Sequence, residues 1–566
     1  MTEIREMNNK YLELYEWWFN PTNKHCWFDA TEIDDSNIVK LFGELIQIDW
    51  ISKINLESLD FKQSIGFILA NDQIIRHWVR VQTKLNNIVN SQVHIDYHFN
   101  IIKYFIKNFY VGNKNIINGH DFCFVLLPLR HEQSYLNIQY VLEETWEKIS
   151  NTNNQELKQI YSKYLKATYQ RSNINTISEY IPETGDIESK SFHTNIEYFI
   201  NKYEKVLDKK CIQYKYNDNY LKINVEKQDI SHGCRSIKMC TNLIVSISGG
   251  VDSMVLSWIL KKLGYNIILV HINYSNRADI SDHEEKFVLE WGSYLGVRTF
   301  FRRLDEINRP KCMGYDLRNL YEEYTRVKRF QTYVEAGKIM GWNNFSIGLG
   351  HNHDDCIENI FTNIASKGKW ENLYGMGFSS NITFANIKLH FIRPFLKVSK
   401  SQIYQFAFEN NILFLWDSTP KWSQRGKIRD LVRPSLLEFN PEIITGLDSM
   451  VQTLNESIQC VDYMVDDWVG VIDGVEEENN DVDKYILKKT LYINKLIKTN
   501  IFWNKLLIKL DIRISVGCLN SLIERLTQIE KNFNQMQLNK NEKFQLNKNL
   551  QIKFYKDSNN KLVIRI

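Results

Sequence analysis

The strongest constraint on the fold is a change of pattern that begins at residue 241. There the run Leu-Ile-Val-Ser-Ile-Ser, residues 243–248, is followed by a Gly-Gly turn and then by a helical pattern, residues 254–263. A second apolar strand is expected at 266–272 and a third at 345–350, each with a helical segment after it. Strands and helices that alternate at this spacing form a parallel sheet with right-handed crossovers. The sequence therefore predicts a central α/β unit of the Rossmann-like class.

The loop after the first of these strands has the sequence Ser-Gly-Gly-Val-Asp-Ser. Its glycines let the backbone approach a polyphosphate closely, and the amide groups that open the next helix donate hydrogen bonds to anions. A plain strand-to-helix turn is the alternative, but such a pattern would arise by chance in on the order of one in a few thousand chains of average composition. No Gly-Lys-Ser or Gly-Lys-Thr occurs, so this is not a Walker loop. We expect a bound nucleotide polyphosphate, with contacts from Ser248, Gly249, Gly250, Val251, Asp252 and Ser253.

The rest of the chain divides by pattern into three further regions. Residues 1–172 show apolar side chains at helical spacing throughout, and residues 173–230 are more polar, with one helical candidate at 192–207. Residues 441–566 return to helix and end in short strands. The low numbers of glycine (24) and proline (8) among 566 residues also favour long helices. We predict a multidomain protein with an all-α N-terminal domain, a connector at 173–230, the α/β domain at 231–440 and a small helical and β C-terminal domain.

Composition excludes several classes of protein. With 43% hydrophobic and 13% aromatic residues the chain is not disordered, and a net charge of +3 gives no global basic field. None of the nine cysteines forms a Cys-x-x-Cys pair, which argues against zinc ribbons and iron–sulfur clusters. The N-terminus has acids where a signal peptide needs an apolar core, and there is no run of 18 apolar residues. We expect a soluble cytoplasmic protein without membrane contact, although an organellar or viral-host origin stays open.

Carboxylates cluster where the helix after the third strand begins. Asp354, Asp355 and Glu358 follow His351, and residues four apart lie on one face of a helix. Such a cluster suits an ammonium group or Mg²⁺. Helix capping and favourable interaction with the helix dipole are the alternative roles. Asp252, in the phosphate loop, is the candidate ligand for Mg²⁺, because a carboxylate beside bare phosphate would otherwise be unfavourable.

Taken with these motifs, the chain resembles the PP-loop ATP pyrophosphatases, which split ATP between its α and β phosphates. Within that superfamily, stretches between about residues 240 and 440 look like the tRNA(Ile)-lysidine synthetase family. A weaker likeness continues to the C-terminus, which is similar to that family's middle domain. The matching stretches are His271-Ile-Asn273-Tyr274-Ser-Asn-Arg277, Thr325-Arg326-Val-Lys-Arg329-Phe330, Gly350-His351-Asn-His353-Asp354-Asp355-Cys-Ile-Glu358-Asn359, Leu373-Tyr-Gly375-Met376, Arg393-Pro394-Phe-Leu396, Asp417-Ser-Thr419 and Arg425-Gly-Lys427-Ile428-Arg429.

The resemblance implies a ligase that forms a C–N bond. ATP would adenylate the C2 oxygen of the wobble cytidine in tRNA(Ile) with a CAU anticodon, and the ε-amine of free lysine would then attack C2 and release AMP, after the earlier release of pyrophosphate. ATP and Mg²⁺ are the implied cofactors, tRNA(Ile) and lysine the implied partners, and a dimer is an open prospect. The implied site residues are Asp252, His351, Asp354, Asp355 and Glu358 for catalysis, His271, Arg326 and the loop for ATP, and Arg329, Lys367, Arg425 and Arg429 for tRNA.

Departures from the family pattern leave two alternatives open. Tyr274 replaces a second histidine, and Ser366-Lys367-Gly368 replaces an Arg-Gly pair, so that Lys367 would have to supply the charge. One alternative is another PP-loop tRNA modification enzyme of the thiolation type, although those relatives commonly use paired cysteines. The other is an inactive homologue that only binds nucleotide or tRNA.

The two ends of the chain carry weaker signals. Residues 13–135 resemble a TPR-like helical family of unknown function, through Trp17-Trp18-Phe19, Trp27-Phe28, Asp72-Gln73-Ile-Ile-Arg76 and Pro128-Leu-Arg-His131-Glu132-Gln133. There we expect a buried Asp72–Arg76 pair and tryptophans that pack helices.

Residues 531–566 contain eight basic and two acidic residues, a net charge of +6. Because phosphate contacts set affinity for nucleic acids, we predict that this end helps to bind tRNA.

Overall fold

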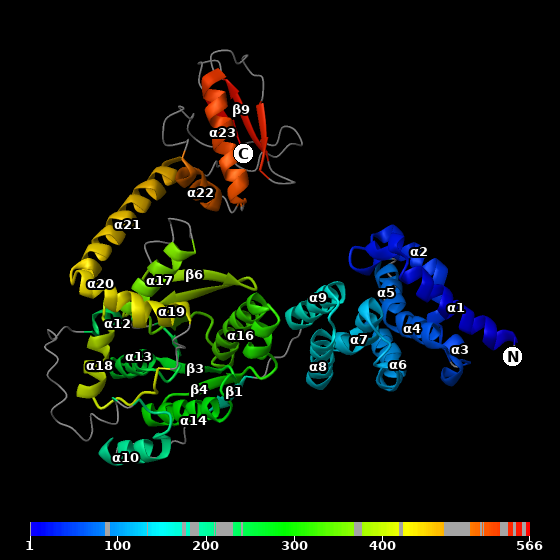
Figure 1. The fold of residues 1–566 in the computed structure, drawn as a ribbon, viewed down its shortest axis with the longest axis horizontal. Coiled ribbons are helices and arrows are strands. Elements are labelled where there is room, and N and C mark those ends of the chain that lie inside the picture. Colours follow the sequence, from blue (N-terminus) through cyan, green and yellow to red (C-terminus); the bar gives the residue numbers. More distant parts are fainter. Residues whose placement is uncertain are drawn as a thin grey trace.

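The computed structural model shows a helical unit, a central α/β unit and a small C-terminal unit (Figure 1). The structure describes the chain between Thr2 and Arg565. Outside the described residues are positions 1, 52, 85–90, 133, 172–176, 182–191, 209, 211–229, 239–240, 367–375, 418–422, 469–498, 510–511, 513, 533–541, 547–550, 557–561 and 566.

The N-terminal unit is all-helical, as predicted. Its α4 begins at a capping box, in which Asp60 accepts from the amide of Gln63 at 2.8 Å and the Gln63 side chain accepts from the amide of Asp60 at 3.0 Å. The helices are α1 (Thr2–Trp18), η1 (Pro21–Trp27), α2 (Glu32–Phe42), η2 (Gly43–Ile46), α3 (Ile48–Ile51), η3 (Leu56–Ser58), α4 (Phe61–Leu69), η4 (Ala70–Ile74), α5 (Ile75–Lys84), α6 (Ser91–Asn113), α7 (Gly119–Glu132), α8 (Tyr135–Asn151) and α9 (Gln155–Arg171).

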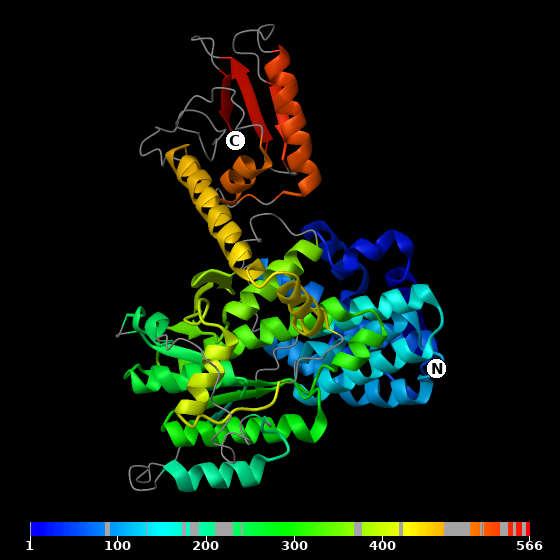
Figure 2. The ribbon, with the colours of Figure 1, turned by 60° about the vertical axis from the view of Figure 1, so that its left-hand side comes forward.

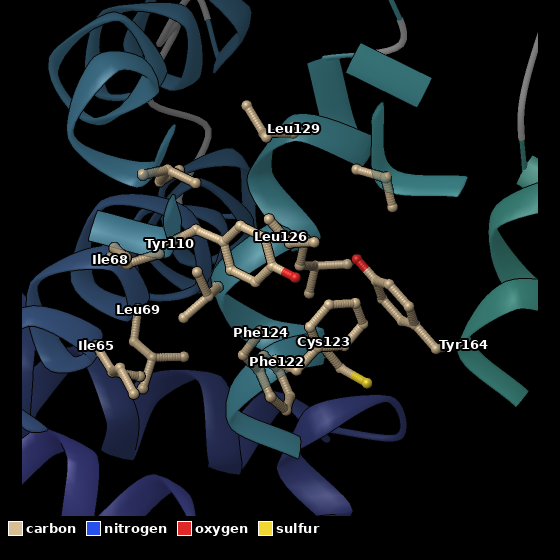
Figure 3. Packing of buried hydrophobic residues seen from close by; sticks show 14 of the residues in the cluster. Ile65, Ile68, Leu69, Tyr110, Phe122, Cys123, Phe124, Leu126, Leu129 and Tyr164 are labelled. Atoms are coloured by element: carbon tan, nitrogen blue, oxygen red, sulfur yellow. The ribbon is translucent and has the colours of Figure 1, made fainter. Parts of the chain in front are cut away.

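The core of this unit forms around α7. Phe122 and Leu126 of α7 lie between Leu69 of α4 and Tyr164 of α9, and all of them are buried (Figure 3). The predicted ion pair is present, since Arg76 Nε lies 3.1 Å from Asp72 Oδ1 and Asp72 is buried. Trp18 is fully buried, which confirms the expected packing role of a tryptophan here.

The central unit contains a seven-stranded sheet with the order β1-β4-β3-β2-β5-β7-β6. The five inner strands run parallel, and β1 and β6 are antiparallel at the edges, which confirms the predicted α/β class. Its strands are β1 (Ser178–Tyr180), β2 (Leu243–Ser246), β3 (Ile267–Asn273), β4 (Thr299–Arg303), β5 (Ser346–Gly348), β6 (Ser379–Phe384) and β7 (Ile387–Ile392), and its helices are α10 (Phe192–Tyr203), α12 (His232–Arg235), α13 (Val251–Lys262), α14 (Ala278–Leu295), α15 (Arg309–Gly314), α16 (Arg318–Ile339), α17 (His353–Ala365), α18 (Lys400–Glu409), α19 (Gln424–Lys427), η7 (Ile428–Val432) and α20 (Arg433–Phe439).

Alternate residues of the inner strands face two different cores. Leu243 and Val245 of β2 pack in the cluster that contains α13, α14 and α18, whereas Ile244 packs in the cluster that contains α16. Helices therefore cover both faces of the sheet, as a buried parallel sheet requires. Two elements of the segment predicted as a connector join this unit, since β1 pairs with β4 and α10 contacts α14.

The C-terminal unit is reached through a long helix, α21 (Ile443–Trp468), which extends away from the central sheet in both ribbon views (Figures 1 and 2). Buried side chains of its two helices and of the strand Gln551–Lys556 form a separate core that includes Trp503, Leu522 and Phe554. The predicted terminal strands pair antiparallel, with Leu562 opposite Lys556, and the turn between them lies outside the described residues. The elements are α22 (Asn500–Lys509), α23 (Val516–Asn532), β8 (Glu542–Gln545), β9 (Gln551–Lys556) and β10 (Leu562–Arg565).

The N-terminal and central units share one hydrophobic cluster. Tyr169 of α9 stacks edge-on against Tyr324 of α16, with ring centroids 4.9 Å apart, and its hydroxyl donates to the Glu306 carbonyl at 2.9 Å. Ile307, Cys312 and Leu320 belong to the same cluster as the N-terminal core. Among the described helices, none has the length and apolar character needed to cross a bilayer.

Candidate active site

The phosphate loop connects β2 to α13 at the carboxyl end of the parallel strands. Gly249 has φ +82°, a backbone conformation that favours glycine. A Cβ there would also lie 2.3 Å from Leu415 Cδ1, so that the Leu415 side chain would have to move. The Leu415 amide donates to the Gly249 carbonyl at 2.8 Å and holds the loop from the far side. Ligands of open α/β sheets bind at this edge, where the strand order reverses.

Hydroxyl groups inside the loop fix its shape. Ser253 Oγ donates to the Gly250 carbonyl at 2.9 Å and accepts from the Ser248 amide at 3.2 Å. Ser253 is buried, so its hydroxyl serves the loop itself. The conformation that would receive a polyphosphate is therefore built into the chain.

The loop forms one wall of a cavity of about 840 Å³, a size typical of small-molecule sites. Side chains from well-separated parts of the chain complete the cavity. It therefore places carboxylates and arginines beside the glycine loop. Its predicted members are Ser248, Gly250, Val251, Asp252, His271, Arg329, Asp355, Arg425 and Arg429.

His271 is a neutral hydrogen-bond acceptor at the end of β3. Its Nδ1 lies 3.0 Å from the Ile247 carbonyl, and because a carbonyl only accepts, the proton must be on Nδ1. Burial lowers the pKa of His271, which keeps the ring neutral. Nε2 is then left with a lone pair, and the residue lines the cavity.

Asp252 is held between two partners that come from other parts of the central unit. Asn352 Nδ2 donates to Oδ1 at 2.8 Å, and the Lys400 ammonium forms an ion pair with Oδ2. Burial raises the pKa of Asp252, while Lys400 and Asn352 favour its charged form. The carboxylate is therefore positioned at the start of α13 with its charge balanced by a lysine.

Arginines cover the predicted carboxylate cluster. Arg425 Nε and Arg429 Nε each donate to Glu358 at 2.8 Å, and Arg425 also pairs with Asp355. Glu358 is almost fully buried. Burial alone would lower the pKa of Arg429, but the carboxylates of Glu358 and Asp417 outweigh burial and raise the pKa. These carboxylates therefore stabilise the positive charge of the arginine.

The first turn of α17 also forms a capping box. Asn352 accepts from the Asp355 amide at 3.1 Å, and Asp355 Oδ2 accepts from the Asn352 amide at 3.1 Å. Asp355 therefore caps the helix with one oxygen and binds Arg425 with the other. Asp354 pairs with Arg433 at 2.5 Å, and its second oxygen is buried with no hydrogen-bond partner among the described residues.

The remaining predicted residues lie at the margins of the cavity or beyond it. His351 follows β5, and burial lowers its pKa to about 4, while its Nδ1 is buried without a partner in the described part of the chain. Arg326 lies on α16 and lines a neighbouring pocket of about 510 Å³ with Tyr274 and Arg329. Lys367 lies outside the described residues.

Several cavity residues were missed by sequence reasoning, Lys400 above all. It begins α18, directly after the N-cap Ser399 and four residues after the Arg-Pro-Phe-Leu stretch. In a lysine-rich chain that position gives no signal of its own. Asn352, which donates to Asp252, and Arg433, which pairs with Asp354, were also missed. So were Tyr404 and Trp416 of the cavity wall.

No preformed metal cluster lies beside the loop within the described ranges. The described part of the chain contains one group of three possible metal ligands, and this group lies in the N-terminal unit, at His25, Cys26 and Asp34. Mg²⁺ is usually held by one or two carboxylates together with substrate phosphates, and Asp252 supplies a carboxylate in the loop. The donor set therefore fits a metal that arrives with the nucleotide.

Comparisons with known proteins match this part of the chain. Residues 221–438 match the family model of the PP-loop domain. The tRNA(Ile)-lysidine synthase of Oceanobacillus iheyensis is 29% identical over 231 residues, which is 39% of this chain and 46% of that protein. That of Mesoplasma florum is 28% identical over 218 residues, 38% of this chain and 50% of the relative. In Malacoplasma penetrans the enzyme of that name is 25% identical over 260 residues, 45% of this chain and 80% of the relative.

The resemblance inferred from the motifs is confirmed for the central unit, and a PP-loop domain implies the use of ATP. The chain spans about half the length of the first two of these relatives. Among solved structures, the U34-tRNA thiolase NcsA of Methanococcus maripaludis aligns with a TM-score of 0.32 and 14% identity, over 47% of this chain and 81% of that one. A TM-score this low carries no argument about fold or function.

Proposed function

We propose that this protein is an ATP-dependent ligase that joins lysine to C2 of the wobble cytidine in tRNA(Ile) with a CAU anticodon. The observation that carries the proposal is the cavity that joins the phosphate loop to the paired carboxylates and arginines. The similarity of the same residues to tRNA(Ile)-lysidine synthases supports the choice of substrate. A location in the cytoplasm belongs to the same proposal.

ATP would bind with its phosphates on the loop amides at the start of α13, where the helix dipole favours anions. His271 Nε2 can accept a hydrogen bond from the nucleotide, because Nδ1 carries the proton. Mg²⁺, when bound, would neutralise the phosphates and polarise them toward attack. Lys400 can exchange its pairing with Asp252 for a phosphate oxygen.

The pairing of carboxylates with arginines suggests how lysine and tRNA could share the site. Arg425 and Arg429 line the cavity and are partly exposed, so phosphate groups can compete with Asp355 and Glu358 for them. Once released, those carboxylates would hold the ammonium groups of lysine. We therefore propose that Asp354, Asp355 and Glu358 act on the amine donor after a phosphate ligand has engaged the arginines.

The proposed function predicts strict dependence on both substrates. Purified protein should release AMP and pyrophosphate from ATP when lysine and a CAU-anticodon tRNA(Ile) are both present, and the wobble nucleoside should gain the mass of lysine less water. The same tRNA with uridine at the wobble position, and ornithine in place of lysine, are the matched controls. Turnover that ignores lysine but needs a sulfur donor would contradict the proposal.

The thiolation alternative is less well supported by the cysteines. Seven are described, and all of them are free. Cys356 lies in the first turn of α17, near the cavity's carboxylates, and burial raises the pKa of its thiol to about 11. A sulfur relay needs the opposite, a thiol whose pKa is lowered.

The C-terminal unit is the proposed tRNA-binding end, but its architecture changes the experiment. Leu546, Ile552 and Phe554 pack with α22 and α23 in one core, so truncation before Lys531 would expose that core. Exposed lysines are therefore the better targets. Glutamine at Lys531 and Lys543 should weaken tRNA binding and lower the slope of log K against log salt by about one for each phosphate that the protein no longer neutralises.

Filter binding across a salt series measures that slope. ATP affinity should be unchanged, because neither lysine lines the cavity. Glutamine at Lys40 and Lys163, two lysines of the helical unit, is the matched control. An unchanged slope in the Lys531/Lys543 variant would remove this unit from the tRNA interface.

A further inference from the structure

Three side chains with different ligand atoms converge at the edge of the N-terminal unit. His25 and Cys26 belong to η1, and Asp34 belongs to the first turn of α2. One nitrogen, one sulfur and one oxygen atom of these residues all lie within 4.8 Å of one another. Unlike a cluster of surface acids, this set mixes the three atom types that Zn²⁺ prefers in proteins.

The imidazole of His25 is oriented as a metal ligand would be. Its Nδ1 lies 3.1 Å from the Thr22 carbonyl, so Nδ1 carries the proton and Nε2 carries the lone pair. Histidines that bind metals usually donate their other N–H in this way to a carbonyl or carboxylate. The unprotonated Nε2 points at Cys26 Sγ and at Asp34 Oδ1.

Asp34 has one oxygen engaged and one oxygen aimed at the cluster. The amide and the hydroxyl of Thr31 donate to Oδ2 at 2.8 and 2.7 Å, as parts of the capping box of α2. Oδ1 is left facing His25 Nε2, which cannot donate to it in the tautomer that Thr22 sets. When the ring is neutral, two acceptor atoms therefore face each other, and either a proton on Nε2 or a shared metal cation would stabilise them.

The two separations that involve His25 Nε2 are close to those of tetrahedral coordination. His25 Nε2 lies 3.4 Å from Asp34 Oδ1 and 3.3 Å from Cys26 Sγ. Atoms bound to one tetrahedral zinc, with Zn–N and Zn–O of about 2.0 Å and Zn–S of about 2.3 Å, lie about 3.3 to 3.5 Å apart. Small side-chain adjustments would bring all three atoms to bonding distance of a common ion.

We propose that His25, Cys26 and Asp34 bind a Zn²⁺ ion through Nε2, Sγ and Oδ1, with the fourth position open to water or an external ligand. On binding, the Cys26 thiol loses its proton to solvent and coordinates as thiolate. Asp35, the next residue, is not a ligand, because Arg80 and His77 occupy its carboxylate. The ion would join η1 to α2 in the part of the helical unit that Figure 1 shows away from the central sheet.

The full-length protein, purified without a polyhistidine tag, tests the site with the metals alone. After dialysis against Zn²⁺ and removal of the excess, elemental analysis should give one zinc per chain. Co²⁺ added to the metal-free protein should give a thiolate-to-cobalt charge-transfer band and the intense visible bands of tetrahedral cobalt. ATP turnover plays no part in either readout, so this test does not depend on the proposed function.

Variants assign the binding to these three residues. Cys26→Ala should abolish the charge-transfer band, and Asp34→Asn should weaken zinc binding about tenfold or more. His25→Gln changes a half-exposed side chain and should weaken binding without affecting the fold, which circular dichroism checks. Asp29→Asn in the same loop and Cys460→Ala, an exposed thiol elsewhere, are the matched controls and should bind as the unaltered protein does.

The outcomes divide clearly. Stoichiometric zinc that is lost in Cys26→Ala and His25→Gln, and retained in both controls, supports the site. A chain that binds neither metal, or one that binds both equally well after Cys26→Ala, would overturn the proposal.

Discussion

Replacing Asp252 with asparagine is expected to lower the rate of pyrophosphate release by about 10²- to 10³-fold, which is the scale for loss of one preorganised charged contact in an active site. The side chain lies at the start of α13, with Asn352 on one oxygen and Lys400 on the other. Asparagine keeps the shape and removes the charge that positions Lys400 and, in the proposed mechanism, Mg²⁺. Initial rates of pyrophosphate release in the presence of lysine and tRNA measure the effect.

The affinity for ATP should not fall together with turnover. Removing a negative charge beside the phosphates leaves Lys400 free to pair with them, so nucleotide affinity should stay the same or rise while kcat falls. Asp279→Asn is the matched control, since Asp279 is an exposed aspartate in the first turn of α14 and does not line the cavity. A variant of Asp252 with unchanged turnover would contradict the proposed role of this carboxylate in the release of pyrophosphate.

Local pattern was sufficient to predict β2, β3 and β5, three of the five inner strands of the sheet, but not β4 or β7. β2, β3 and β5 are buried almost throughout, because helices cover both faces of the sheet, and they lie in mainly apolar runs that are visible in the sequence. The edge strands β1 and β6 have exposed faces and polar sequences, and neither was predicted. Short edge strands are stabilised by pairing with a neighbour, and β4, with two arginines among its five residues, also gave too weak a signal.

The site shows the same division between local and tertiary information. The loop and the start of α17 are contiguous motifs, and both could be located from residue order alone. Lys400 could not, because it meets Asp252 from 148 positions further along the chain. Sequence reasoning also treated Arg425 and Arg429 as phosphate ligands and the acids as a separate cluster, whereas the fold pairs the two groups directly.

That pairing makes Glu358 the residue that holds the arginine segment, residues 425–433, against α17. Glu358 is almost fully buried and accepts from Arg425 and Arg429, so glutamine there would place an amide N–H₂ against guanidinium donors. We expect Glu358→Gln to destabilise the central unit by about 2 kcal/mol, less than for a fully buried pair because both arginines are partly exposed. α19 and η7 should lose their attachment to α17 first.

Hydrogen exchange and denaturant unfolding together test this expectation. Amides of residues 424–432 should exchange faster in Glu358→Gln, and pyrophosphate release should fall because Arg425 and Arg429 no longer hold their places in the cavity wall. Adding Arg429→Gln should cost less in the Glu358→Gln background than alone, since the arginine has already lost its partner. Glu438→Gln, an exposed glutamate on α20, is the matched control. Strictly additive effects on stability would mean that Glu358 and Arg429 act independently, and that the arginine segment is held to the acids by Arg425 with Asp355 and by Arg433 with Asp354 instead.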